Sequence, residues 1–142
     1  MLTLTASTQT QSPIALIVDD QEWSSRSLES VLSINGYRTI RAGSIHAALE
    51  AVDHEQLDLL LISSDLPNDD GLDLCRAVRK KVKFGLGLPI MMMAPDPPSR
   101  KRRLAALRAG AWEFLSHPID PEELLLRLDT YLQARFALNQ PR

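Results

Sequence analysis

The chain has 142 residues, of which 44% are hydrophobic and 24% are charged, and its formal net charge is −2. These values predict one ordinary globular domain, because domains commonly hold about 100 to 150 residues and disordered chains are poorer in hydrophobic residues. They exclude a global electrostatic attraction to nucleic acid, and no apolar run approaches the roughly 20 residues of a membrane-spanning helix.

The single cysteine and the first residues bear on the cellular compartment. Cys75 has no second cysteine to pair with, so an internal disulfide is excluded and a reducing compartment is the simpler interpretation. Residues 1–12 lack the basic start and apolar stretch of a secretion signal, and their Thr, Ser and Gln content is typical of a flexible arm. We therefore expect a cytoplasmic protein with an arm at 1–12, a domain at 13–136 and a tail or linker start at 137–142.

From Pro13 onward, short apolar runs alternate with longer segments whose apolar residues recur at helical spacing. We predict that the short runs are strands, at 14–18, 38–40, 58–62, 89–93 and 112–115. The third and fourth are apolar almost throughout, as strands covered on both faces must be. This alternation predicts a parallel sheet with those two strands at its centre.

Five helices are predicted to follow these strands, each from a set of apolar residues on one face. Ser44 is expected to cap the second helix and Asp120 the fifth, where Pro121 suits the first turn. Five such units predict an α/β fold with a doubly wound, five-stranded parallel sheet, not an eight-stranded barrel. The apolar sets are Leu28, Val31 and Leu32; Ala48, Leu49 and Val52; Leu72, Leu74, Cys75 and Val78; Leu104, Leu107 and Ala111; and Leu124, Leu125, Leu128 and Leu132.

Four strand ends are expected to converge at one edge of this sheet, where ligands of open parallel sheets bind. Asp19 and Asp20 follow the first strand, and two adjacent carboxylates there are costly unless they are solvated, paired or bound to a cation such as Mg²⁺. The alternative is structural, with Asp20 capping the next helix and Asp19 solvated. The other three ends carry Ser63, Ala94 and His117.

Four stretches of the sequence resemble the receiver domain of two-component response regulators. They are IALIVDDQ, LDLLLISSDLPNDDGLDLCRAVR, LPIMMMAP and RAGAWEFLSHPIDPEELLLRL, and together they span about residues 13 to 136. The double Asp, the turn at 66–71, the A-G-A at 109–111 and the x-P-x-D at 117–120 occur in the family's order. The resemblance implies a (βα)5 flavodoxin-like receiver fold and a role in phosphorelay signal transduction.

The functional positions of the family are only partly matched. In receivers an acidic pair helps to hold Mg²⁺, an Asp ending strand three accepts phosphate, a Thr or Ser ends strand four, and a Lys precedes the strand-five proline. The resemblance places Asp19 and Asp20 at the acidic pair and Phe114 at the aromatic that reports the switch. The phosphoacceptor, hydroxyl and lysine positions are instead Ser63, Ala94 and His117.

Each departure removes one part of phosphotransfer. Ser63 lacks the carboxylate nucleophile, and a serine is weak at neutral pH without an activating base. The methyl group of Ala94 cannot donate to a phosphoryl oxygen, and the ring of His117 lacks the reach and fixed charge of a lysine. We therefore predict a degenerate receiver: a protein-interaction module that is not an enzyme, works without aspartyl phosphorylation, and binds Mg²⁺ weakly or not at all.

Two alternatives keep chemistry at this edge. A receiver still phosphorylated with Mg²⁺ would use Asp65 or Ser63 as a non-standard acceptor, although the turn at 66–71 fixes the register and leaves Asp65 roughly 6 to 7 Å beyond the usual position. Alternatively, Ser63, His117 and one carboxylate of the acidic pair imitate a serine nucleophile with its base and orienter. The sequence offers no oxyanion hole or small-molecule substrate pocket to support the second alternative.

A run of four basic residues opens the fourth predicted helix: Arg100, Lys101, Arg102 and Arg103. A solvated face is the simplest interpretation. The family's output face is built from the fourth helix, fifth strand and fifth helix, so the resemblance implies contact there with another signalling protein or a second copy of the chain. Trp112 is predicted to lie exposed on the same side as Phe114 and to join this face. No helix-turn-helix accompanies the run, which argues against nucleic-acid binding.

Overall fold

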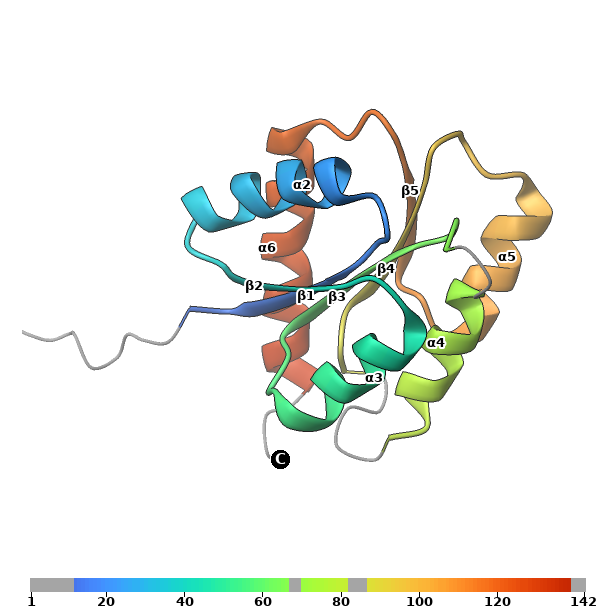
Figure 1. Ribbon diagram of the computed structural model, residues 1–142, viewed down its shortest axis with the longest axis horizontal. Helices are drawn as coiled ribbons and strands as arrows, with labels where there is room; N and C mark the ends of the chain where they lie inside the picture. Colours follow the sequence, from blue (N-terminus) through green and yellow to red (C-terminus); the bar gives the residue numbers. More distant parts are fainter. Residues whose placement is uncertain (1–11, 67–69, 82–86, 139–142) are drawn as a thin grey trace, which may run out of the picture.

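The computed structural model describes residues 12–66, 70–81 and 87–138. Most of the predicted arm, residues 139–142 of the predicted tail and positions 67–69 of the predicted turn lie outside these ranges. Within them, five strands form one parallel sheet in the order β2-β1-β3-β4-β5, which confirms the predicted doubly wound fold (Figure 1). The strands are β1 (Ile14–Val18), β2 (Arg38–Ala42), β3 (Leu59–Ser63), β4 (Ile90–Ala94) and β5 (Glu113–Ser116).

Helices cover both faces of the sheet. They are α2 (Glu22–Ile34), α3 (Ile45–His54), α4 (Gly71–Arg79), α5 (Arg100–Ala109) and α6 (Pro121–Leu138). One face packs against α3, α4 and α5, and the other packs against α2 and α6 (Figure 1). No helix in the described ranges has the length and apolar content needed to cross a membrane.

The inner strands are apolar at successive positions because alternate residues reach opposite faces. Leu60 and Ile62 of β3 point into the cluster under α3, α4 and α5, whereas Leu59 and Leu61 point into the cluster under α2 and α6. All four are fully buried. We name these clusters the α3–α5 core and the α2–α6 core.

Side chains at the helix starts agree with the expected caps. Ser44 Oγ accepts a hydrogen bond from the Ala47 amide at 3.1 Å, and Asp120 Oδ1 accepts one from the Glu122 amide at 3.0 Å. These bonds satisfy amide groups that have no partner inside the first helical turn.

The apolar set predicted for the fourth helix is partly wrong. The helix, α5, ends at Ala109 because Gly110 takes a left-handed conformation with φ of 109°. Ala111 therefore lies beyond the helix, although it is buried, and Leu107 is 50% exposed. The helix packs instead through small residues, Ala106 and Ala109.

The small residues of α5 let it approach α4 closely. The buried thiol of Cys75 donates to the Ala109 carbonyl at 3.2 Å, and Arg79 donates to the Gly110 carbonyl through Nε at 2.9 Å and Nη2 at 2.7 Å. Burial raises the pKa of the Cys75 thiol. The C-terminal ends of the two helices are thereby fixed to each other on the α3–α5 core.

Candidate functional site at the carboxyl edge

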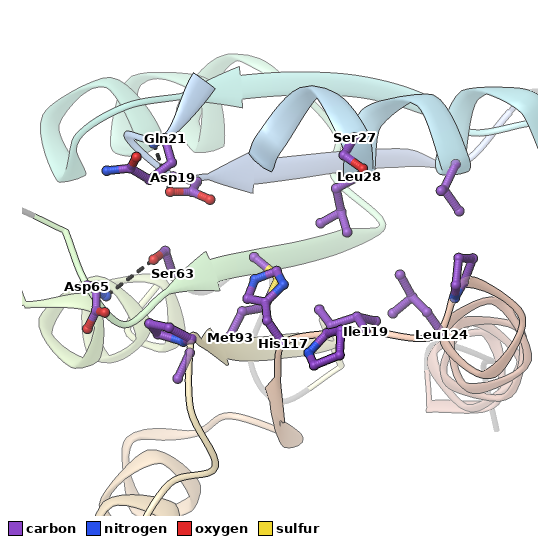
Figure 2. A pocket seen from close by; sticks show the side chains of 15 residues that line it. Asp19, Gln21, Ser27, Leu28, Ser63, Asp65, Met93, His117, Ile119 and Leu124 are labelled. Carbon is purple, nitrogen blue, oxygen red and sulfur yellow. Dashed lines mark hydrogen bonds between the residues drawn. The ribbon is translucent and has the colours of Figure 1, made fainter. Parts of the chain in front are cut away.

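The structure brings the residues at four strand ends together. Asp19 follows β1, Ser63 ends β3, Ala94 ends β4 and His117 follows β5, and all four line one cavity of about 810 Å³ (Figure 2). The parallel register aligns the ends, since Val18 is paired with Ile62 and Ser63 with Met93. The sequence did not indicate a cavity of this size at the edge.

The acidic pair separates into an inner and an outer carboxylate. Asp19 is half-buried and lines the cavity, and its Oδ1 accepts the Gln21 amide at 3.0 Å. Asp20 is exposed, and its Oδ2 accepts from Gln21 Nε2 at 3.3 Å. Gln21, not Asp20, is the residue that precedes the first residue of α2, so the alternative in which Asp20 caps this helix is wrong.

Ser63 is half-buried, and its hydroxyl oxygen accepts the amide of Asp65 at 3.2 Å. Among the hydrogen bonds of the described residues, none joins Ser63 to His117 or to a carboxylate, as a base-activated serine would require. Asp65 is exposed and lines the same cavity, and its Oδ1 lies 3.5 Å from the hydroxyl of Ser64. Asp65 is therefore a second acidic residue along this cavity, close in sequence to Ser63.

The ends of β4 and β5 complete the edge. Ala94 is 1% exposed, and its carbonyl accepts the amide of His117 at 2.9 Å. The peptide bond from His117 to Pro118 is cis. The His117 side chain is exposed and stands at the middle of the cavity in Figure 2.

The acidic side chains are a poor fit for Mg²⁺, which demands near-octahedral oxygen ligands. Within the described ranges, no group of three or more His, Cys, Asp or Glu side chains is placed to hold one metal ion. Only Asp19 of the acidic pair lines the cavity, and the end of β3 supplies the hydroxyl of Ser63 in place of a carboxylate.

One residue of the basic run has a structural role that the sequence did not reveal. All four basic side chains are exposed. Arg102, however, donates from Nη2 to Ser64 Oγ at 3.0 Å, and its guanidinium carbon lies 5.6 Å from the ring centroid of Phe114. Arg102 thus connects α5, the segment after β3, and the aromatic side chain of β5. A solvated face is an incomplete description of this run.

The prediction that Trp112 is exposed beside Phe114 is wrong. Trp112 is half-buried and packs edge-on against Tyr131 of α6, with ring centroids 5.6 Å apart and an interplanar angle of 87°. Phe114 packs on the opposite face, against the α3–α5 core. The alternation of side chains starts at Glu113, the first residue of β5, and does not extend back to Trp112.

Glu113 of β5 contacts polar side chains of α6, and the sequence did not predict these contacts. Its carboxylate accepts hydrogen bonds from Arg127 and from the hydroxyl of Tyr131, both on α6. Burial, followed by the hydrogen bond and the charge of Glu113, raises the pKa of Tyr131 to about 12. The contact between β5 and α6 is therefore polar at its outer margin.

Comparison with known proteins agrees with this architecture. Residues 15–129 match the response regulator receiver domain family. The chain is 37% identical over 118 residues to the response regulator MprA of Mycobacterium leprae, which covers 83% of this chain and 50% of that protein. The chain thus spans about half the length of the curated relatives that it matches.

Solved structures show the same fold. A putative response regulator from Chloroflexus aurantiacus is similar at a TM-score of 0.80 and 33% identity, covering 87% of this chain and 99% of that one. A CheY-like receiver domain protein from Methanospirillum hungatei reaches a TM-score of 0.82 at 24% identity, covering 91% and 100% of the respective chains. The match over residues 15–129 shows that this chain belongs to the response regulator receiver domain family.

Proposed function

We propose that this chain is a degenerate receiver, a cytoplasmic protein-interaction module of phosphorelay signal transduction that works without aspartyl phosphorylation. The observation that carries the proposal is the chemistry of three residues lining one cavity: Ser63, Ala94 and His117. They offer a hydroxyl, a methyl group and an imidazole where phosphotransfer in receivers uses a carboxylate, a hydroxyl and an ammonium group. At each of the three positions, the group that serves phosphotransfer in receivers is therefore absent.

The local contacts support this proposal. The Ser63 hydroxyl accepts a hydrogen bond from a backbone amide, which does not raise its nucleophilicity. The methyl group of Ala94 is buried at the end of β4 and has no donor for a phosphoryl oxygen. A phosphoryl group in this cavity would therefore lack the contacts that stabilise it and the contacts through which it could shift a conformational equilibrium.

One observation favours a second candidate function. Asp65 is exposed and lines the same cavity as Ser63, so a carboxylate is present close to the end of β3. In this alternative the chain is a receiver that is phosphorylated on Asp65 with the help of Mg²⁺. The two candidates differ in whether the chain gains a covalently bound phosphate, which changes its mass.

Intact-mass spectrometry after incubation with acetyl phosphate and Mg²⁺ separates the two candidates. We expect no stable gain of one phosphate in the unmodified chain. A gain that persists in Asp96→Asn but disappears in Asp65→Asn would establish the second candidate, because Asp96 is an exposed aspartate that does not line the cavity. A gain that survives acid, as a phosphate ester does and an acyl phosphate does not, and that disappears only in Ser63→Ala would identify Ser63 as the acceptor and equally contradict the leading proposal.

We further propose that Mg²⁺ binds weakly or not at all, because no three acidic side chains in the described ranges are placed to hold one ion, and Ser63 supplies a hydroxyl where receivers have a carboxylate. Isothermal titration calorimetry should detect no submillimolar site in the unmodified chain. The Ser63→Asp variant should gain one, since the new carboxylate would supply the oxygen ligand that the cation lacks. A submillimolar site in the unmodified chain that is lost in Asp19→Asn would contradict this proposal.

The partner proposed for this module is another signalling protein or a second copy of the chain, bound at the face of α5, β5 and α6. Arg100 and Lys101 test this face better than Arg102, which has contacts within the fold. Lys101→Glu should weaken association and its dependence on salt, whereas Lys80→Glu, an equal change at an exposed site after α4, should not. Sedimentation velocity at low and high salt measures self-association, and equal behaviour of both variants would argue against a homodimer through this face.

A further inference from the structure

The cavity at the carboxyl edge extends well beyond the positions that serve phosphotransfer in receivers. Figure 2 shows Asp19, Ser63 and Asp65 at one end, with Leu28, Ile119 and Leu124 at the other and His117 between them. The far end lies between α2 and α6, because Leu28 belongs to α2 and Leu124 to α6. The cavity is therefore elongated, with an acidic end and an apolar end.

The volume and the mainly apolar lining of the cavity are within the range of small-molecule sites. Its volume of about 810 Å³ lies within the roughly 300 to 1,000 Å³ that is usual for ligand pockets. Such pockets are lined mainly by apolar side chains with a few polar groups that fix orientation. An apolar group that filled the end near Leu28, Ile119 and Leu124 would remove these side chains from water.

The polar end of the cavity carries two acidic residues, Asp19 and Asp65. Asp19 and Asp65 form no ion pair with any residue in the described ranges, and each carboxylate accepts a hydrogen bond from a neighbouring neutral group. Ionised carboxylates can accept several hydrogen bonds each, so acceptor capacity remains at this end. An ammonium group has three donors and tolerates varied geometry, whereas Mg²⁺ requires an ordered octahedral set.

We propose that the cavity binds a small organic cation, with a primary ammonium group at the end lined by Asp19 and Asp65 and an apolar body between α2 and α6. This goes beyond the proposed function, which assigns no ligand to the cavity. Occupancy would give the module a chemical input that needs no phosphoryl group.

Three probes with one carbon skeleton test the charge of the ligand. They are 4-phenylbutylamine, 4-phenylbutanol and 4-phenylbutyrate, each titrated into the chain at neutral pH and followed by two-dimensional amide NMR. The amine should bind with a dissociation constant on the order of 1 mM, as suits a fragment-sized ligand. It should bind roughly fivefold more tightly than the alcohol, because an exposed charge pair contributes little more, and the anionic butyrate should bind most weakly. Equal binding of the amine and the butyrate, or no shift of cavity amides by the amine, overturns the proposal.

A matched pair of variants tests the location. Ser27 and Ser30 are both exposed on α2, but only Ser27 lines the cavity. Ser27→Trp should fill the apolar end and weaken the amine and the alcohol at least tenfold, while Ser30→Trp should leave both unchanged. Equal effects of the two tryptophans, or none from Ser27→Trp, contradict this location. The dispersion of the amide spectrum shows whether each variant is folded.

A second pair tests the acidic end. Asp65→Asn should remove most of the preference for the amine over the alcohol, without changing the affinity for the alcohol. Asp96→Asn, at an exposed aspartate outside the cavity, should keep that preference. A preference that survives Asp65→Asn undiminished shows that Asp65 does not bind the cation and overturns the assignment.

Discussion

The two faces of the sheet differ in the size of their buried clusters and in their relation to the cavity at the carboxyl edge. Among the described residues, the buried cluster under α3, α4 and α5 is the larger one, and its members run from Leu16 of β1 to Ala111, the residue after Gly110. Under α2 and α6 the cluster is smaller, and its carboxyl edge opens into the cavity beside Leu124. The first face therefore has the more extensive buried packing, whereas residues of α2 and α6 on the second face line the cavity.

Truncating one leucine on each face gives the largest expected difference. Leu74 of α4 is fully buried in the α3–α5 core, and Leu124 of α6 is 1% exposed but lines the cavity. Leu74→Ala should lower the free energy of unfolding by about 3 to 5 kcal/mol, and Leu124→Ala by about 2 to 3 kcal/mol, because a side chain beside an existing cavity has fewer contacts to lose. Urea denaturation measures both, and an equal or larger loss for Leu124→Ala would break the comparison.

The glycines that follow α5 and α2, one on each face of the sheet, give a second comparison. Gly110 ends α5 with φ of 109°, and Gly36 follows α2 with φ of 91°. A Cβ at Gly110 would lie 2.6 Å from Arg79 Cγ, whereas none of the described atoms would lie within 4 Å of one at Gly36. Gly110→Ala should therefore lower the free energy of unfolding by about 2 to 3 kcal/mol, and Gly36→Ala by about 1 to 2 kcal/mol, the cost of the left-handed backbone alone. Thermal and urea unfolding of the pair would show whether the two ends differ.

The contact of Arg102 should have a smaller and more local effect. Arg102→Ala removes a hydrogen bond to Ser64 and a cation–π contact with Phe114, each worth about 0.5 to 1 kcal/mol at an exposed site. Amide hydrogen exchange after β3, at Asp65, should become several-fold faster. Arg100→Ala, at an exposed position of the same helix, is the control and should leave that exchange unchanged.

The ionisation of two tyrosines gives the smallest expected effect, because it changes stability only at high pH. Both pack against the α2–α6 core, and burial raises the pKa of Tyr131 to about 12 and that of Tyr37 above its ordinary value. Since the folded state favours the neutral phenol, this stabilisation is complete below pH 10 and is lost as the pH rises through about 12. Ultraviolet titration should show an ionisation near pH 12 in the wild type that Tyr131→Phe lacks. Ionisation of the Tyr131 phenol near the ordinary pKa of tyrosine would contradict burial of its ring.

The fold was predictable because it depends on local pattern. Fully apolar runs identify strands covered on both faces, and Ser44 and Asp120 mark helix starts by residue type alone. The end of α5 was misplaced because Ala111 continues the apolar spacing although Gly110 stops the helix. Periodicity cannot detect a single residue that changes the direction of the backbone.

The candidate site was predictable only in part. The convergence of Asp19, Ser63, Ala94 and His117 follows from strand order, because all strands are parallel. The Arg102 contact and the orientation of Trp112 do not follow, because they join residues far apart in sequence. The cavity does not follow either, since it depends on how closely α2 and α6 approach each other and no single residue encodes that spacing.

The buried thiol of Cys75 can report on local separation of α4 from α5. Its hydrogen bond to the Ala109 carbonyl lies inside the seam between α4 and α5, and burial raises the pKa of the thiol. A thiol reagent can therefore modify it only while the two helices are apart, and the labelling rate gives the population of that opened state. With no other cysteine in the sequence to compete, the rate measured with and without a bound partner would reveal whether a contact made on the surface of α5 tightens or loosens the interior behind it.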